Sequence, residues 1–420
     1  MKRKLHNNSI FSRIHTTISA FIILLSISNV SAQLFVAEHG QLQVEGNQIV
    51  DQSGEVIQLR GMSLYWSQWN SDSLQKKNKF YTSGTVKWLR DDWKCTVVRA
   101  AMGVEDTLGY AVDSLQETQV TTVADAAIEH GIYVIIDYHS HLAHENPALA
   151  KKFFAKMAKR YAGKPNVIYE TYNEPRTDDW SAVKAYHEEV IEVIRQYDKE
   201  NIIIAGTPFY CQHIDKAANN PLSDSNVAYA VHYYAAKHDF RTQTKSAMDK
   251  GIAVFISEYG TVDYNGQGDP SVKGSQDWWT FLDENNIGNC NWSLHDLLEG
   301  ASALKLGASP DGGWGEDELT ASGKLVRDYL SGRAEVDPVT DVENNVITNS
   351  ISISPNPFNT SFHVEEIGSF TYKLVNSLGK ELLAGKGENK AEIIVEVFPG
   401  VYTIILESAK GMKISKVIKE

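Results

Sequence analysis

The chain has 420 residues, of which 42% are hydrophobic and 22% are charged, a composition that excludes a disordered or fibrous protein and provides for a large core. Forty lysine and arginine residues against 53 aspartate and glutamate residues leave a net charge of −13, which argues against nucleic acid or an anionic membrane surface as the partner. A neutral or cationic substrate fits this charge better.

The first 32 residues have the features of a secretory signal peptide. Four basic and no acidic side chains precede an apolar run over residues 18–30, and the small residues Ser31 and Ala32 close the segment. A run of about 13 apolar residues is too short to cross a hydrocarbon layer of roughly 30 Å. We therefore expect residues 1–32 to be a removed signal peptide rather than a membrane anchor.

Residues 33–332 show the pattern of an α/β barrel. Most of the β-rich runs are continuous and apolar, as expected of parallel strands covered on both faces, and helical patterns such as those over 147–161 and 180–197 lie between them. The alternation predicts a (β/α)8 TIM barrel as the catalytic domain. A doubly wound open sheet is the alternative, but no glycine-rich phosphate loop follows the first run. The eight strand candidates are 56–61, 96–101, 133–138, 167–172, 202–206, 228–233, 253–258 and 288–293.

Polar and aromatic residues gather where these runs end. The chemistry of a barrel of this type lies at the carboxyl ends of its strands, and such residues would be costly in the barrel core. We therefore expect them to converge at one rim. They are Arg99, Asp137, His139, Asn173, Glu174, His232, Tyr234, Glu258 and Trp292.

Two glutamates at this rim suit the cleavage of a glycosidic bond. One carboxylic acid can protonate the leaving oxygen while a second carboxylate attacks the sugar or activates water. Arg99, His232 and Tyr234 are candidates to keep Glu258 ionised as the nucleophile. Glu174 faces a negative partner, so we expect a raised pKa and a role as acid and then base.

Aromatic residues near the same rim suggest a surface for sugar rings. Trp292 ends the last run, and Tyr65 and Trp69 follow the first. Aromatic faces of this kind stack on pyranose rings. We expect all three to bind substrate.

Two other functions are weaker alternatives. A metal-dependent hydrolase is suggested by His139-Ser140-His141, but in such barrels the histidine pair lies on the first strand and further ligands are needed. A catalytically silent sugar-binding protein would be expected to lose one of the two glutamates. The three cysteines, Cys95, Cys211 and Cys290, are interpreted as buried small hydrophobic residues. A disulfide between two of them is the alternative.

A polar stretch over residues 333–347 predicts a linker. After it, residues 348–420 contain short β-like runs separated by turn residues, which predict a small antiparallel β-sandwich domain. A carbohydrate-binding module is one reading, but this segment has no tryptophan and two tyrosines, whereas such modules usually display aromatic rings.

Sequence motifs of the central region resemble glycoside hydrolase family 5, in particular its subfamily 2 of bacterial endoglucanases. The resemblance implies a metal-free and cofactor-free retaining endo-β-1,4-glucanase, with Glu174 as acid/base and Glu258 as nucleophile. It also implies that Arg99, His139, Asn173, His232 and Tyr234 support them, and that Trp69 and Trp292 stack on sugar. The matching phrases are Leu59-Arg60-Gly61-Met62-Ser63, Gln68-Trp69, Val98-Arg99-Ala100, Asp137-Tyr138-His139, Tyr172-Asn173-Glu174-Pro175, His232-Tyr233-Tyr234, Ser257-Glu258-Tyr259-Gly260, Asn291-Trp292-Ser293-Leu294 and Gly312-Gly313-Trp314.

One position departs from the family pattern, because Leu297 stands where the family commonly has a lysine that contacts a glucosyl unit. Glu299, two residues further, is kept. The same fold also hosts β-mannanases, xyloglucanases and mixed-linkage glucanases, which the site pattern does not separate from a glucanase acting on cellulose-type chains.

The C-terminal region resembles the sorting domain of the type IX secretion system. The matching phrases are Ser354-Pro355-Asn356-Pro357-Phe358, Pro399-Gly400-Val401-Tyr402 and the lysine-rich end over 413–419. This resemblance implies export by the type IX machinery to the cell surface or the medium. We expect a monomer with a β-1,4-glucan as its partner, no nucleic acid, and no membrane span after signal removal.

Overall fold

The computed structural model describes residues 35–69, 78–105, 107–333, 352–375, 381–395, 397, 400–408 and 411–419. The predicted signal peptide, residues 1–32, lies outside these ranges. So does the predicted linker over 333–347, apart from its first residue.

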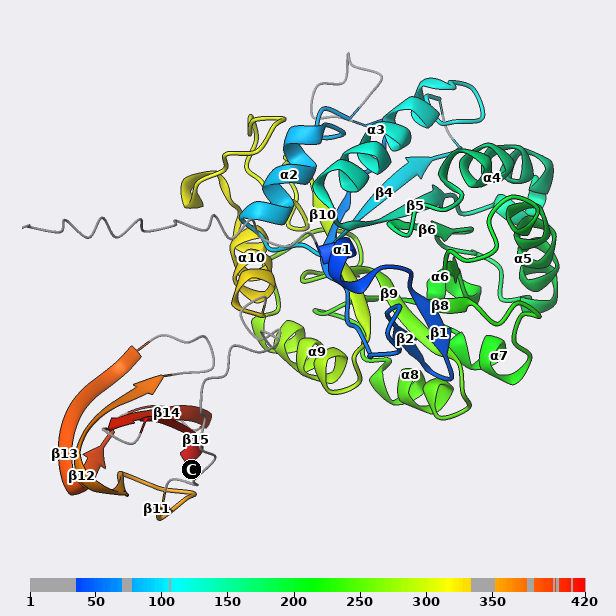
Figure 1. Cartoon of the computed structure of the whole chain (residues 1–420). Coiled ribbons are helices and arrows are strands. Elements are labelled where there is room, and N and C mark those ends of the chain that lie inside the picture. The colour runs from blue at the N-terminus through cyan, green and yellow to red at the C-terminus, as the bar shows by residue number, and fades with distance from the viewer. Residues whose placement is uncertain are drawn as a thin grey trace, which may run out of the picture. The chain divides into compact units, whose positions relative to one another are not determined.

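Eight parallel strands form a closed barrel, as predicted (Figure 1). Each predicted run overlaps one strand, although the first strand begins at Arg60 rather than at residue 56. In the barrel, β10 closes the circle by pairing with both β3 and β9. The strands are β3 (Arg60–Leu64), β4 (Val97–Gly103), β5 (Tyr133–His139), β6 (Val167–Glu170), β7 (Ile203–Ala205), β8 (Val227–Tyr234), β9 (Ala253–Gly260) and β10 (Gly288–Leu294).

Helices surround the barrel, and their apolar faces pack on the outer side of the strands (Figure 1). Local signals fix several of their ends: the Asp179 side chain accepts backbone hydrogen bonds at the start of α5, and Gly131 ends α3 in the left-handed conformation. The helices are α2 (Ser83–Asp91), α3 (Leu115–His130), α4 (Pro147–Tyr161), α5 (Trp180–Arg195), α6 (Pro208–Cys211), α7 (Ile214–Asn219), α8 (Arg241–Met248), α9 (Val272–Glu284) and α10 (Ala321–Arg333), with short 3₁₀ turns η1 (Ala143–Glu145) and η2 (Glu316–Glu318).

A short helix and a hairpin close the amino end of the barrel. Helix α1 (Phe35–His39) and strands β1 (Gln43–Glu45) and β2 (Gln48–Val50) precede the first barrel strand. Their apolar residues join the inner core of the barrel, and the hydroxyl of Tyr133 donates to the Gly40 carbonyl over 2.7 Å. This seal leaves the carboxyl end of the strands as the open rim.

All three cysteines lie within the described residues as free, buried thiols. Cys290 lies in β10 and Cys95 precedes β4, and the Cys211 thiol donates to the Asn173 carbonyl at 3.1 Å. The interpretation of the three cysteines as buried small side chains is confirmed, and none of them forms a disulfide.

The C-terminal part is a separate all-antiparallel β domain. One edge of the long strand β12 pairs with β13 along most of its length, while β11 and β14 share its other edge and β15 pairs with β14. Phenylalanine and aliphatic side chains from these strands form its own core. The strands are β11 (Ser352–Ser354), β12 (Ser361–Val375), β13 (Glu381–Ile394), β14 (Gly400–Ser408) and β15 (Gly411–Lys419).

In the part of the chain that the structure describes, every helix is too short or too polar to cross a bilayer.

Candidate active site

The residues predicted from the strand ends converge at the open rim. Arg99 lies in β4, His139 in β5, His232 and Tyr234 in β8, Glu258 in β9 and Trp292 in β10, and the Asn173-Glu174 pair follows β6. Their side chains are buried or nearly so. The rim therefore holds several polar groups away from water, which is costly unless each has a partner.

Arg99 supplies partners to four oxygen atoms of this layer. Its Nε donates to Glu170 Oε2 over 2.6 Å, and its Nη2 donates to Asn173 Oδ1 over 2.6 Å and lies 2.9 Å from Asp137 Oδ2. Its Nη1 donates to Glu258 Oε2 over 3.2 Å. Burial would lower the pKa of Arg99, but the three carboxylates raise it well above its usual value. A permanent positive charge thus lies behind the two predicted catalytic glutamates.

Glu258 is held at both of its carboxylate oxygens. Arg99 donates to Oε2, and the Tyr234 hydroxyl donates to Oε1 over 2.7 Å. Two such hydrogen bonds from a cation and a phenol stabilise the carboxylate and fix its orientation. Arg99 and Tyr234 are two of the three neighbours predicted for Glu258, whereas the third, His232, makes its hydrogen bonds to Glu174 and Ser257.

Glu174 contacts two imidazoles. Its Oε1 lies 2.9 Å from His232 Nδ1, and its Oε2 lies 3.2 Å from His141 Nε2. Burial alone would raise the pKa of Glu174, but the hydrogen bonds and charges of the two histidines outweigh burial and lower it. The prediction of a raised pKa was therefore wrong for the free protein, because it took Glu258 as the main neighbour and did not foresee His141.

One oxygen of Glu174, one oxygen of Glu258 and one ring nitrogen of His232 all lie within 4.8 Å of one another. Such a trio could also hold a cation. However, His232 Nδ1 and one oxygen of Glu174 are hydrogen-bonded to each other, and both oxygens of Glu258 accept hydrogen bonds from protein side chains. The geometry suits two carboxylates acting on one bond.

His139 is a neutral group in this layer. Burial and the charge of Arg99 lower its pKa well below the usual value, and its Nδ1 donates to Asp137 Oδ2 over 2.6 Å. Its ring stacks on Trp292 at 5.0 Å between centroids with an angle of 5°. His139 therefore holds Trp292 in place at the side of the rim.

Tyr65 and Glu299 join this aromatic side of the site. Tyr65 lies 5.4 Å from Trp292 and stacks on His295 at 4.4 Å between ring centroids. His295 Nε2 lies 2.8 Å from Glu299 Oε1. Burial, together with the charges of Glu299 and Glu258, raises the pKa of Tyr65 to about 12.

Trp69 is half-buried at the end of the described part of the loop after β3, and its backbone N–H donates to the Trp66 carbonyl over 3.2 Å. Leu297 is half-buried in the segment that joins Trp292 to Glu299. Neither has a contact with Glu174 or Glu258 among the contacts of the described residues.

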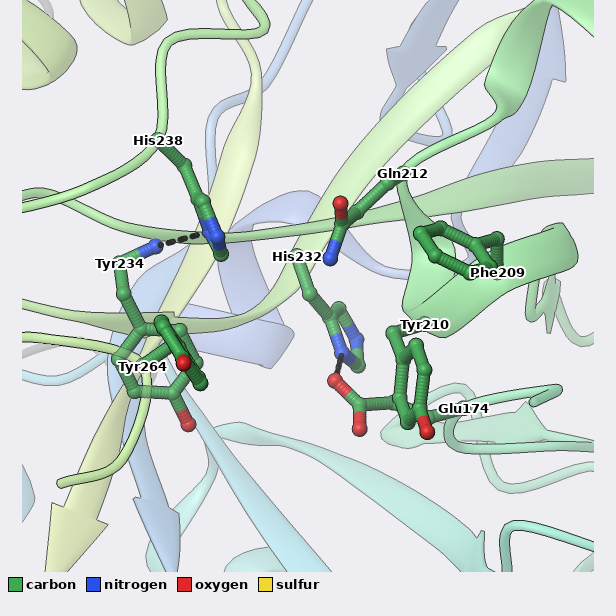
Figure 2. Close-up of a pocket in the computed structure, with 8 residues that line it drawn as sticks. All are labelled: Glu174, Phe209, Tyr210, Gln212, His232, Tyr234, His238 and Tyr264. Carbon is green, nitrogen blue, oxygen red and sulfur yellow. Dashed lines mark hydrogen bonds and ion pairs between the residues drawn. The ribbon is translucent and has the colours of Figure 1, made fainter.

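A cavity of about 510 Å³ opens beside Glu174 (Figure 2). Tyr234, His238 and Tyr264 line one side of it and Phe209 and Tyr210 the other, with His232 between them. Phe209 is 42% exposed and Tyr264 is 61% exposed. Open aromatic faces of this kind are a binding surface for rings.

The loop after β7 is strained where it supplies this cavity. Phe209, Tyr210 and Cys211 have φ values of 53°, 57° and 58°, a conformation that costs non-glycine residues of order 1–3 kcal/mol each. The surrounding structure supports this strain, and it holds Phe209 and Tyr210 at the cavity wall.

Several site residues were not predicted from the sequence. Because β6 ends at Glu170 rather than at residue 172, the carboxylate at that strand end is Glu170, and Glu174 lies four residues further in the loop. A charged residue inside an apolar run was the available signal. The other unpredicted residues are Ser257, His141, Phe209, Tyr210, His238 and Tyr264.

Comparisons with known proteins identify the families of two parts of the chain. The model of the cellulase family, glycosyl hydrolase family 5, matches residues 50–297, and that of the secretion system C-terminal sorting domain matches residues 352–420. Endoglucanase Z of Dickeya dadantii is 43% identical over 69% of this chain and 66% of its own length. Endoglucanase N of Pectobacterium atrosepticum is 41% identical over 74% of this chain and 70% of its own length. The chain thus spans about two thirds of the length of these relatives.

Solved structures give the same result. A structure from Cytophaga hutchinsonii is 49% identical with a TM-score of 0.69, covering 72% of this chain and 97% of that one. The catalytic domain of an endoglucanase from Thermobifida fusca is 33% identical with a TM-score of 0.67, covering 71% and 99%. The barrel, its paired glutamates and these matches lead to one conclusion: the chain belongs to the cellulase family, glycosyl hydrolase family 5, and carries a C-terminal secretion sorting domain.

Proposed function

We propose that the protein is a retaining endo-β-1,4-glucanase that hydrolyses internal bonds of cellulose-type glucans by double displacement, with Glu258 as nucleophile and Glu174 as acid/base. The supporting observation is the approach of the two carboxylates, whose nearest oxygens lie within 4.8 Å. Inverting enzymes need roughly 6.5–9.5 Å between the carboxyl groups to admit a water molecule, whereas retaining enzymes use about 5–5.5 Å.

In the first step, a Glu258 oxygen attacks the anomeric carbon as the glycosidic bond breaks, and the leaving oxygen takes a proton from Glu174. Tyr234 and Arg99 aim the attacking carboxylate. The Asn173 side-chain oxygen accepts from Arg99, which leaves the amide NH₂ to donate to the sugar 2-hydroxyl as charge develops on the ring.

In the second step, water gives a proton to Glu174 and attacks the anomeric carbon, and the ester bond to Glu258 breaks. Two inversions at one carbon give net retention. Arg99 and Tyr234 stabilise the departing Glu258 carboxylate. His139 supports this chemistry indirectly, through Asp137 and Trp292.

The substrate lies across both sides of the site in this proposal. Trp292, Tyr65, Trp69 and Glu299 bind the sugars that become attached to Glu258, and Leu297 offers an apolar contact where a lysine is common in the family. Sugars of the leaving group occupy the cavity lined by Phe209 and Tyr264. Relatives named endoglucanases favour a β-1,4-glucan over the other backbones that this fold accepts.

Two measurements test this function. Reducing-sugar release should be highest on carboxymethylcellulose in a panel with lichenan, xyloglucan and mannan, and a higher rate on another member would reassign the substrate. Proton NMR of the earliest products should show the β-anomer first. Early appearance of the α-anomer would contradict double displacement.

We further propose that residues 1–32 direct the chain across the inner membrane, that 333–347 link the two domains, and that 348–420 engage the type IX machinery for delivery to the surface or the medium. The match of the sorting-domain model to residues 352–420 supports the last of these three assignments. Deleting residues 348–420 in a type IX secreting host should retain the enzyme in the periplasm. Normal release would contradict it.

A further inference from the structure

The buried groups behind the two catalytic glutamates form a continuous hydrogen-bonded chain. Arg99 Nε donates to Glu170 Oε2 over 2.6 Å, and the Ser257 hydroxyl donates to Glu170 Oε1 over 2.5 Å. Ser257 Oγ lies 2.9 Å from His232 Nε2, and His232 Nδ1 lies 2.9 Å from Glu174 Oε1. Glu170 thus connects the guanidinium that contacts the nucleophile to the imidazole that contacts the acid/base.

The middle of this hydrogen-bonded chain is closed to solvent, whereas Glu174 at its end borders the cavity. Glu170 and Ser257 have no exposed surface, and His232 is 2% exposed. The hydroxyl of Ser257 and the ring of His232 must therefore find their partners within the chain, because an unpaired polar group at this depth is costly. The proton positions along the chain are consequently coupled to one another.

Hydrogen-bonding rules allow two arrangements when His232 is neutral. If Glu170 is a carboxylate, it accepts from Ser257, and Ser257 in turn accepts from His232 Nε2–H; the bare Nδ1 then accepts a proton from neutral Glu174. If Glu170 holds the proton, every bond reverses. His232 Nδ1–H then donates to Glu174, which must be a carboxylate.

A third arrangement has the same number of protons: His232 is a cation that donates from both nitrogens, and Glu170 and Glu174 are both carboxylates. Burial lowers the pKa of His232, but its hydrogen bond to Glu174 and the charge of Glu258 outweigh burial and raise it. Burial also raises the pKa of Glu170, although the charge of Arg99 opposes this. The charged and titratable groups that face His232 from the packed strands and their loops are Arg99, Asp137, Glu170, Glu174 and Glu258.

We propose that Glu170 and Ser257 are positioning residues that fix the Nε2–H form of His232 and so make the shared proton available to Glu174 when the glycosidic bond breaks. The inference rests on the proposed function, since it concerns the proton of the acid/base. Over one turnover the hydrogen-bonded chain neither gains nor loses a proton, because Glu174 gives one to the leaving oxygen and regains one from the attacking water.

Substitution of Glu170 by glutamine gives a sharp test. A glutamine that still accepts from Arg99 must donate its NH₂ to Ser257, so the Ser257 hydroxyl donates to a bare His232 Nε2 and the ring proton lies on Nδ1, facing a Glu174 carboxylate. Glu170→Gln should therefore lower kcat on carboxymethylcellulose by about 10²-fold or more, because general acid catalysis contributes typically 10²–10⁴-fold. On 2,4-dinitrophenyl cellobioside, whose leaving group needs no proton, the loss should be less than about 3-fold.

Ser257→Ala interrupts the chain without imposing a tautomer. It should lower kcat on carboxymethylcellulose by about 10-fold and leave turnover of the dinitrophenyl substrate nearly unchanged. Because it removes only one hydroxyl group, it replaces Glu170→Gln as the test if that variant proves thermally unstable. Ser63→Ala is the matched control: Ser63 is equally buried and its Oγ lies 3.3 Å from Arg99 Nη1, on the nucleophile side of the guanidinium. Its loss should be equal on both substrates.

Long-range ¹⁵N–¹H correlation spectra of histidine-labelled protein report the tautomer directly. The ring of His232 should carry a proton on Nε2 in the wild type and on Nδ1 alone in Glu170→Gln. Equal losses on both substrates for Glu170→Gln and Ser257→Ala, or an unchanged tautomer, would overturn the proposal and leave Glu170 a purely structural partner of Arg99. A wild type inactive on both substrates would instead overturn the proposed function.

Discussion

At the scale of single residues, Glu174 and Glu258 have different surroundings, and these lead to different responses to the same substitution. Glu174 lies within hydrogen-bonding distance of two imidazoles, whereas Glu258 accepts hydrogen bonds from Tyr234 and Arg99. In the proposed mechanism the first carboxyl group transfers a proton and the second attacks the sugar.

Glu174→Gln should lower kcat on carboxymethylcellulose by about 10²–10⁴-fold, because it removes proton transfer. Most of this loss should disappear on a dinitrophenyl glycoside when burst kinetics isolate the glycosylation step. Glu258→Gln removes the attacking atom, so its loss should be at least about 10⁴-fold on both substrates. Equal rescue of the two variants would reverse the role assignment.

The pH dependence should reflect the Glu174–His232 pair rather than either residue alone. The raised pKa of His232 means that the Glu174–His232 pair keeps its proton to higher pH than a free histidine would. Acid catalysis needs that proton. The basic limb of kcat/KM should therefore have its midpoint above about 6.5, the usual histidine value. A pH–rate profile in the free-enzyme regime checks this, and a midpoint below 6.5 would contradict it.

At the scale of elements, the loops after β7 and β9 supply two aromatic faces to one cavity. Phe209 lies in the strained α6 segment, and Tyr264 follows β9. Both line the cavity beside Glu174, where the proposed function puts the sugars of the leaving group.

Phe209→Ala and Tyr264→Ala should each raise KM for cellopentaose about 5- to 30-fold, because stacking of a ring contributes of order 1–2 kcal/mol, while turnover of dinitrophenyl cellobioside changes little. Tyr197→Ala is the control: this residue is 44% exposed and follows α5, at the closed end of the barrel. If the control and the loop variants shifted KM alike, the cavity would not bind sugar.

Elements are also where sequence prediction was most and least successful. Continuous apolar runs identified all eight strands, because parallel strands covered on both faces leave a strong signal. The strand-end rule then located the predicted rim residues. It did not identify Phe209 or Tyr264, since loops have no periodicity, and the contact between His141 and Glu174 joins two loops that the sequence does not relate.

At the scale of the whole molecule, the barrel and the C-terminal domain have separate cores. The barrel is closed strand to strand, and its last helix, α10, ends at Arg333. We expect a chain ending at residue 336 to be soluble, with kcat on carboxymethylcellulose and a melting temperature equal to those of the barrel in the full chain. Loss of activity on this soluble substrate would make residues 348–420 part of the site.

The three buried thiols have a consequence for how the chain matures outside the cytoplasm. Since none is paired or exposed, the fold depends on no oxidative step, and thiol–disulfide catalysts have nothing to form or to correct. An exported enzyme of this kind can reach its native state with or without an oxidant, and its half-life should be the same with or without a reducing agent.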